Sequence, residues 1–178
     1  MNSGREFYSG GVHGRGWKTW VSVLCRLGLV AVWLVSGVIK AADPLQTRVA
    51  VAAYQLLPDP AVDPVATALP FVEIGLGLLL LLGVGVRLSA VASGLLLVVF
   101  LIGVSSSWAR GLSIDCGCFG GGGVADVGPL DYLTEIARDV GFVVVSGWLV
   151  VLPRTPVALG PGSHTGTPVS ETAGGVRS

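Results

Sequence analysis

The sequence has little charge. Asp, Glu, Lys and Arg make up only 12 % of its 178 residues, whereas an ordinary soluble domain carries about 25 %. Hydrophobic residues account for 52 %, and the mean hydropathy is +0.76. A chain with so few polar side chains cannot coat a soluble globule, so we expect an integral membrane protein.

Two further absences exclude classes of ligand. The net charge is zero, which gives no reason to expect nucleic-acid binding. The glycine run at 120–123 lacks the Lys and the Ser or Thr of a phosphate-binding P-loop. Neither a nucleic acid nor a nucleotide phosphate is therefore an expected ligand.

Long apolar runs dominate the chain. Each of the first three runs has the length of about 20 residues that a helix needs to cross a bilayer. The fourth is shorter and opens with Arg138 and Asp139. The predicted spans are residues 20–39, 65–86, 88–108 and 136–152. The predicted fold is therefore all-α, an integral membrane four-helix bundle over residues 20–152.

The basic residues predict the orientation, because they concentrate on the cytoplasmic side of membrane proteins. Seven lie in or next to the two tails and the turn between spans two and three, against four on the other side. The seven are Arg5, Arg15, Lys18, Arg26, Arg87, Arg154 and Arg177, and the four are Lys40, Arg48, Arg110 and Arg138. We expect a multi-pass protein of the cell membrane with a cytoplasmic tail at 1–19, a disordered cytoplasmic tail at 153–178, and extracytoplasmic loops at 40–64 and 109–131.

The first of these loops contains a helix signal. Asp43 is a favourable N-cap residue, and Pro44 suits the first helical position. Apolar residues then recur at helical spacing until Pro58 ends the pattern. They are Leu45, Val49, Ala52, Ala53 and Leu56. We expect a short amphipathic helix that lies on the outer surface or caps the bundle.

Charged residues within the spans are costly unless they are paired or functional. Glu73 lies eight residues into the second span, about 12 Å along the helix. Lys40 ends the first span, and Arg138 opens the fourth. We expect Glu73 to form a buried pair with Lys40 or Arg138, which either fixes the helix register or serves the function. Arg26 is expected to reach the cytoplasmic interface.

Cys116 and Cys118 flank Gly117 and form a CxC motif on the expected extracytoplasmic side, where disulfides form and persist. Three interpretations compete. A CxC disulfide closes a very small ring, and strained, exposed disulfides exchange readily. A structural cross-link over so short a loop removes little chain entropy. Two thiolates would suit Cu(I) or Zn(II), yet a closed zinc site needs four ligands. Both histidines fall in the cytoplasmic tails, which leaves only Asp115 as a neighbouring ligand.

We favour the redox pair and predict no metal site. Gly117 eases the tight turn, and the glycines at 120–123 let another backbone approach the sulfurs. Cys25 is fourteen residues from Ile39, or about 21 Å along a helix, beyond the reach of a disulfide to the CxC pair. One pair must then perform all the thiol chemistry. Its electrons would leave to a quinone or to a second protein, and we favour the protein because no residue set marks a quinone pocket.

Three segments resemble a known family. They are VSGVIKAADP at the end of the first span, PFVEIGLGLLLLLG in the second, and RGLSIDCGCFGGG after the third. Over residues 20–152 the chain resembles the DoxX-like superfamily of four-helix membrane proteins, and within it the MauE branch, named for methylamine utilisation. The resemblance implies a membrane factor that works with a thioredoxin-like partner to form or maintain disulfides in an exported protein. In methylamine-using bacteria that protein is the small subunit of methylamine dehydrogenase.

The functional prediction is extracytoplasmic thiol–disulfide exchange, by an oxidoreductase or a component of one. The partners expected are the lipid bilayer and a thioredoxin-like protein. The predicted site has Cys116 and Cys118 as the redox pair, with Asp115, Gly117, Glu73, Lys40 and Arg138 in supporting positions. The alternative is a non-enzymatic assembly or scaffold subunit whose CGC loop is structural.

Overall fold

The computed structural model describes residues 13–115, 123–124 and 128–152. The predictions for Cys116, Gly117, Cys118 and the tail at 153–178 lie outside this part of the chain. The prediction of an all-α protein is confirmed for the described residues, which contain five helices and two strands of two residues each. The helices are α1 (His13–Ala42), α2 (Pro44–Ala53), α3 (Asp59–Leu82), α4 (Val86–Ala109) and α5 (Pro129–Val151), and the strands are β1 (Ile114–Asp115) and β2 (Gly123–Val124).

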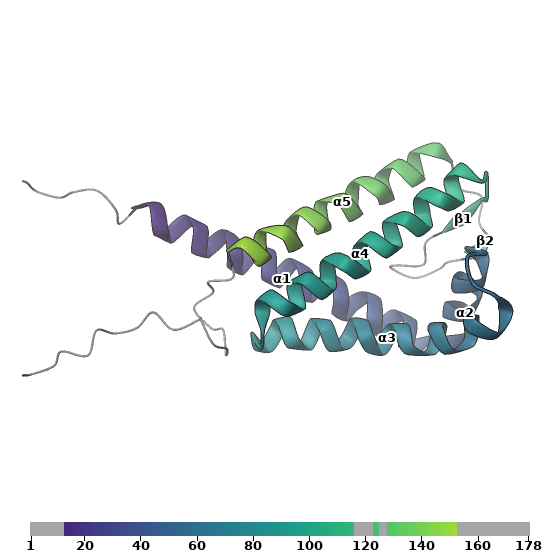
Figure 1. Cartoon of the computed structure of the whole chain (residues 1–178), viewed down its shortest axis with the longest axis horizontal. Helices are drawn as coiled ribbons and strands as arrows, with labels where there is room; N and C mark the ends of the chain where they lie inside the picture. Colours follow the sequence, from purple (N-terminus) through teal and green to yellow (C-terminus); the bar gives the residue numbers. More distant parts are fainter. Residues whose placement is uncertain (1–12, 116–122, 125–127, 153–178) are drawn as a thin grey trace, which may run out of the picture.

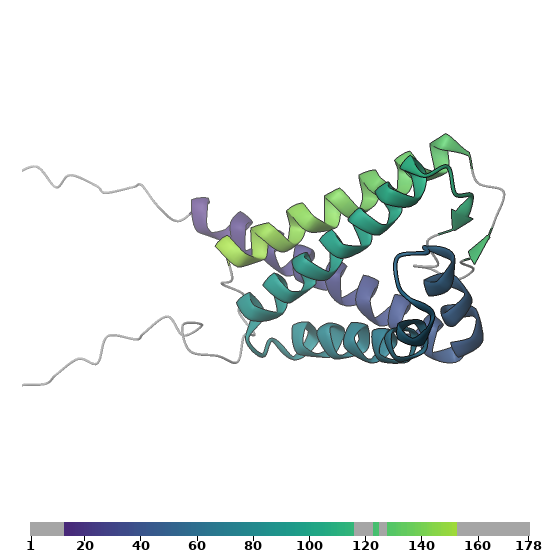
Figure 2. The ribbon, with the colours of Figure 1, turned by 45° about the vertical axis from the view of Figure 1, so that its right-hand side comes forward.

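The four long helices pack as two pairs, α1 with α3 and α4 with α5 (Figure 1). A short turn joins α3 to α4 at one end of the molecule, and from there the two helices diverge (Figure 1). At the opposite end, which we call the α2 end, α2 and the two strands lie beside the open side of the bundle (Figure 2). The molecule is therefore tightly joined at one end and spread at the other.

Glycines set the turn between α3 and α4. The second span was expected to run to Val86, but α3 ends at Leu82. Gly83 and Gly85 have φ angles of 72° and 55°, in the left-handed region that other residues rarely adopt. The chain reverses within these residues, so Val86 begins α4 instead of ending α3.

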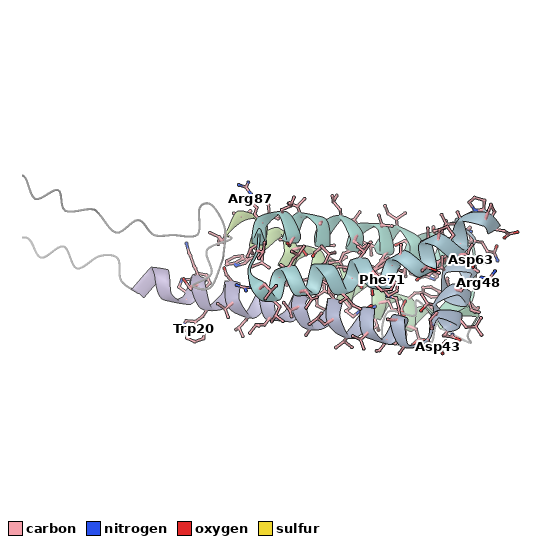
Figure 3. The ribbon with its side chains drawn as sticks, turned by 90° about the horizontal axis from the view of Figure 1, so that it is seen from below. Trp20, Asp43, Arg48, Asp63, Phe71 and Arg87 are labelled. Atoms are coloured by element: carbon pink, nitrogen blue, oxygen red, sulfur yellow. The ribbon has the colours of Figure 1, made fainter. Side chains whose placement is uncertain are left out.

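The interior is unusually polar and the exterior unusually apolar. Large side chains on the long helices are exposed, among them Trp20, Leu88 and Val144, and Figure 3 shows Trp20 projecting away from the other helices. The buried polar residues are mostly serines: Ser22, Ser36, Ser89, Ser93, Ser107 and Ser146. Small polar residues at helix contacts and apolar ones outside are typical of helices packed within lipid. The pattern supports a membrane environment.

In the part of the chain that the structure describes, three helices are long and apolar enough to cross a membrane: residues Trp17–Ala42 of α1, α3 and α4. α5 has 23 residues but is not among them. Its first half carries four charged residues, Asp131, Glu135, Arg138 and Asp139. The fourth expected span therefore differs in composition from the other three.

Trp33 links the two helix pairs. Its side chain is only 1 % exposed, and its Nε1 donates a hydrogen bond of 2.9 Å to Ser93 Oγ, from α1 to α4. Its ring lies 6.3 Å from that of Phe100. The surrounding core consists of Leu29, Val30, Leu76, Leu80, Ala90, Leu97 and Leu149. A buried indole needs a partner for its N–H, so this bond fixes α1 against α4.

Arg26 occupies an internal position near the α3–α4 turn. Its side chain is largely buried, and its guanidinium donates to the carbonyl oxygens of Leu80 and Leu81, the latter at 2.8 Å. These carbonyls belong to the last turn of α3, where a cation is favourable because the helix dipole is negative there. Arg26 therefore caps α3 and ties it to α1.

Two glycines let α1 and α3 approach closely. A Cβ on Gly37 would lie 2.7 Å from a side-chain carbon of Ile74 and 3.0 Å from the carbonyl oxygen of Pro70, a backbone atom that cannot turn away. A Cβ on Gly77 would lie 2.7 Å from Leu34. Small residues at such contacts allow two membrane helices to pack backbone to backbone.

Replacing Gly37 by Ala should force α1 and α3 apart and lower the free energy of unfolding by about 1–3 kcal/mol, the cost of overpacking. The matched control is Gly28→Ala on the same helix, where a Cβ meets nothing within 4 Å. That change should be neutral or stabilise by up to about 1 kcal/mol through helix propensity. Unfolding in detergent, followed by circular dichroism, measures both. Equal effects of the two substitutions would contradict the close contact at Gly37.

Candidate functional site

A buried ion pair lies toward the α2 end. Lys40 Nζ is 2.6 Å from Glu73 Oε1, and the two side chains are 7 % and 0 % exposed. Lys40 also donates to Ser36 Oγ at 2.7 Å and lies 5.5 Å from the centre of the Phe100 ring. The predicted pairing of Glu73 is thus confirmed, with Lys40 as the partner. Arg138, the other candidate, lies on α5 and is paired with Asp139 at 3.4 Å.

Glu73 depends on Lys40 because its other oxygen, Oε2, is buried and has no hydrogen-bond partner among the described residues. The carboxylate is also farther from its helix start than expected, because α3 begins at Asp59, fourteen residues before it. That separation is about 21 Å along the helix. A half-satisfied carboxylate at such a position is costly to leave without a counter-charge. Lys40 supplies that charge from the end of α1.

α2 is attached to this pair through Thr47. As predicted, α2 begins at Pro44, and Asp43 Oδ1 accepts a hydrogen bond of 3.0 Å from Gln46 N. It ends at Ala53, before Leu56. Thr47 Oγ1 lies 3.0 Å from the carbonyl oxygens of both Lys40 and Asp43. Its hydroxyl is therefore a hydrogen-bond donor to carbonyl groups at the C-terminal end of α1. Sequence reasoning missed this contact, although a threonine four residues after an N-cap is a recognisable signal.

The face of α2 that meets the bundle is formed by Thr47 and Ala50, which are buried. Leu45 and Val49, from the predicted apolar stripe, are 70 % and 46 % exposed. α2 packs against α3 and α1, while Leu45 and Val49 point away from the protein. Arg48 on α2 and Asp63 on α3 form an exposed ion pair beside it (Figure 3).

A cavity of about 500 Å³ lies between α2 and the diverging halves of α3 and α4, next to Lys40. Its buried residues are Lys40, Thr47, Ala50 and Gly103, and its exposed apolar residues are Leu56, Leu57, Val65 and Val99. The ring of Tyr54 also lines it, 3.4 Å from where a Cβ on Gly103 would lie. This cavity could not be predicted from the sequence, because it results from the angle between two helices.

The segment that contains the CGC motif is bracketed by β1 and β2. The two strands pair antiparallel, with Ile114 opposite Val124 and Asp115 opposite Gly123. β2 lies against α2 (Figure 2). Asp115, a predicted supporting residue, is therefore a strand residue at the α2 end, whereas Cys116, Gly117 and Cys118 lie outside the described residues.

Tyr132 fixes the chain just before this motif. Its hydroxyl donates to the carbonyl oxygen of Leu112 and accepts a hydrogen bond of 3.1 Å from Ile114 N. Its ring stacks on Trp108, with centroids 6.0 Å apart and planes at 6°. One side chain of α5 thus holds both the end of α4 and the start of β1. Neither Tyr132 nor Trp108 was predicted from the sequence, although two aromatic residues flanking the loop were a usable signal.

Arg110 closes the same end of the molecule. Its guanidinium donates to the carbonyl oxygens of Tyr54 and Gln55, where α2 ends and the chain turns toward α3. Gln55 has a φ of 50°, a left-handed conformation that is uncommon outside glycine. The ends of α2 and α4 are thereby joined next to the cavity.

The described residues contain no group of three or more His, Cys, Asp or Glu side chains that could hold a metal ion. Cys25 lies on α1, fifteen residues before Lys40 and so about 22 Å away along the helix. The chemistry that the α2 end offers is therefore a buried ammonium–carboxylate pair, an apolar cavity and two anchored strands that flank a cysteine motif.

Breaking the ion pair should be costly. Glu73→Gln or Lys40→Met should each lower the free energy of unfolding by on the order of 3–5 kcal/mol, because the remaining charge is buried without its partner. The double variant Lys40→Met with Glu73→Gln should recover most of that loss, since no buried charge is left. Unfolding of all four proteins in the same detergent gives the coupling energy. Additive losses in the double variant would show that the two side chains do not stabilise each other.

Comparisons with known proteins give one match. Residues 18–152 match the family described as methylamine utilisation protein MauE. Neither the curated proteins nor the solved structures include a match. The match spans most of the chain and includes all three apolar helices, which together with the family indicate a membrane protein. The chain therefore belongs to the MauE family, whose description places it in methylamine utilisation.

Proposed function

We propose that this protein takes part in extracytoplasmic thiol–disulfide exchange through Cys116 and Cys118. It would support disulfide formation or maturation of an exported protein, together with a thioredoxin-like partner. The observation that carries the proposal is the anchoring of the chain on both sides of the motif, by the pairing of β1 with β2 and by the two hydrogen bonds of Tyr132. The description of the MauE family points to methylamine utilisation as the setting of this exchange.

The proposed exchange takes place between two cysteine pairs, one in this protein and one in its partner. A thiolate of one pair attacks the disulfide of the other and forms a mixed disulfide, which the second thiolate of the attacking pair resolves. One pair is oxidised as the other is reduced, and two electrons and two protons are transferred. Such a reaction requires that a partner reach the motif, and the pairing of β1 with β2 anchors the chain on both sides of it.

The proposed topology is a bundle of four membrane-spanning helices, with α5 as the fourth and both termini in the cytoplasm. The exposed apolar residues of α1, α3 and α4 support contact with lipid. The charged residues of α5 gather in its first half, which lies at the α2 end. In this arrangement α2 is an amphipathic helix of the outer surface, with Leu45 and Val49 directed toward the membrane interface.

A second candidate is a non-enzymatic assembly subunit with a structural CGC loop. The stacking of Trp108 on Tyr132 and the pairing of the two strands favour this candidate, because the same contacts would hold an inert loop in place. The two candidates differ in what they require of the sulfur atoms, because a scaffold needs only the shape of the loop.

Substitution of either cysteine distinguishes the two candidate functions. Cys116→Ser and Cys118→Ser should each abolish disulfide formation in the exported client while the protein still accumulates in the membrane. One cysteine cannot both form and resolve a mixed disulfide. Cys25→Ser is the control and should retain full function. The measurement is the redox state of the client, read by thiol alkylation and gel shift. Normal client oxidation in both single variants and in the double variant would establish the scaffold instead.

The topology predicts which cysteines react from outside. A membrane-impermeant maleimide applied to reduced spheroplasts should label Cys116 or Cys118 and leave Cys25 unlabelled, because α1 places Cys25 far from the α2 end. Single-cysteine variants identify the labelled position by mass spectrometry. Labelling of the CGC motif only after the membrane is permeabilised would reverse the proposed orientation.

A further inference from the structure

The cavity at the α2 end has no part in the thiol chemistry proposed above. Its volume of about 500 Å³ is within the range of about 300–1,000 Å³ that is usual for small-molecule sites. It is lined by α1, α2, α3, α4 and the segment between α2 and α3, and nearly all of its lining is apolar. Such a cavity suits a ligand that is itself mainly apolar.

Lys40 supplies the cavity with a hydrogen-bond donor. An ammonium group has three N–H donors. Two of them are used within the protein, by Ser36 Oγ at 2.7 Å and by Glu73 Oε1 at 2.6 Å. Near the third the described residues offer only the face of the Phe100 ring. A ligand that presents an acceptor oxygen to this N–H would complete the coordination of a buried ammonium.

The charges around the cavity favour a neutral ligand. The positive charge of Lys40 is already compensated by Glu73, and among the described residues that line the cavity Lys40 is the only basic one. Asp43 also lines the cavity and would repel an anion. A carboxylate or phosphate would have to compete with Glu73 for the ammonium, whereas a carbonyl oxygen would not.

The walls around Lys40 suit a ring. Phe100 contacts the ammonium from α4, and the Tyr54 ring lies close to Gly103, where a Cβ would be 3.4 Å from it. Both aromatic side chains line the cavity. Aromatic faces favour stacked or tilted contact with another ring system.

The opening of the cavity is apolar and faces outward from the bundle. Leu56, Leu57, Val65 and Val99 are its exposed lining residues. Val99 is ten residues before the end of α4, which is about 15 Å along the helix. In a membrane-spanning bundle this position lies within the hydrocarbon region, so a ligand would enter from the bilayer.

We propose that this cavity binds a neutral, lipid-soluble ring compound that carries a carbonyl group, of the quinone class. A carbonyl oxygen accepts a hydrogen bond from Lys40 Nζ, the ring lies against Phe100 and Tyr54, and the apolar tail leaves between Val65 and Val99. The proposal concerns binding alone and does not depend on the thiol exchange, so either can fail without the other.

The test uses the full-length protein in lipid nanodiscs and decylubiquinone as the probe. The dissociation constant is measured by equilibrium binding and compared with those of decylbenzene, which has the tail and a ring but no carbonyl, and of oleate, which is an anion. We expect decylubiquinone to bind at least tenfold more tightly than either. Equal binding of decylbenzene or oleate, or no binding of decylubiquinone, would overturn the proposal in favour of an acyl-chain site or an empty cavity.

Variants locate the ligand. Gly103→Phe fills the cavity, and Val99→Trp narrows its opening at an exposed position where folding is not at stake. Each should weaken decylubiquinone binding at least tenfold. Ile102→Phe is the matched control, because Ile102 is 61 % exposed on α4 and does not line the cavity. Unchanged affinity in Val99→Trp, or an equal loss in Ile102→Phe, would place the ligand elsewhere.

A last variant tests the hydrogen bond that Lys40 donates to the ligand. Lys40→Met combined with Glu73→Gln removes the ammonium without leaving a buried charge. It should weaken decylubiquinone binding about tenfold, as expected for one lost hydrogen bond to a charged donor, while decylbenzene binding stays the same. An equal change for both compounds would contradict the proposed bond to Lys40.

Discussion

The α2 end is organised around the attraction between one ammonium and one carboxylate in an apolar interior. Glu73 has no exposed surface and relies on Lys40, which comes from the last turns of α1. The pair fixes α1 against α3, while the Phe100 ring above Lys40 adds a contact to α4. Thr47 then holds the first turn of α2 to the carbonyl of Lys40 itself. The position of α2, and with it that of β2, follows from this pair.

Features that depend on residues close together in the sequence could be predicted from the sequence. A charge within an apolar run needs a partner, which identified Glu73 and reduced the candidates to Lys40 and Arg138. An Asp-Pro pair gave the start of α2 correctly. The cavity, the brace formed by Tyr132 and the cap formed by Arg26 were not predicted. Each of them joins residues that are distant in sequence. Their contacts depend on the angles between helices, which no local sequence pattern indicates.

α2 shows why an apolar stripe is ambiguous in a membrane protein. In water, a stripe such as Leu45 and Val49 would turn toward the core, because burial removes it from solvent. Within or beside lipid the exterior is as apolar as the core, so that preference disappears. The contact with the bundle is then decided by the polar groups that need partners, here Thr47 and the end of α1.

The separation of α3 and α4 at the α2 end depends on the angle at the turn that joins them (Figure 1). α4 has 24 residues and is about 36 Å long, so a rotation of one degree at the Gly83–Gly85 turn moves its far end by about 0.6 Å. Arg26 holds α1 and α3 together near that turn, and α5 packs along α4. A change in this angle would rotate α4 with α5 against α1 with α3, and the hydrogen bond from Trp33 to Ser93 would resist it. The width of the cavity thus depends in part on an angle at the opposite end of the molecule, on the other side of the membrane in the proposed topology.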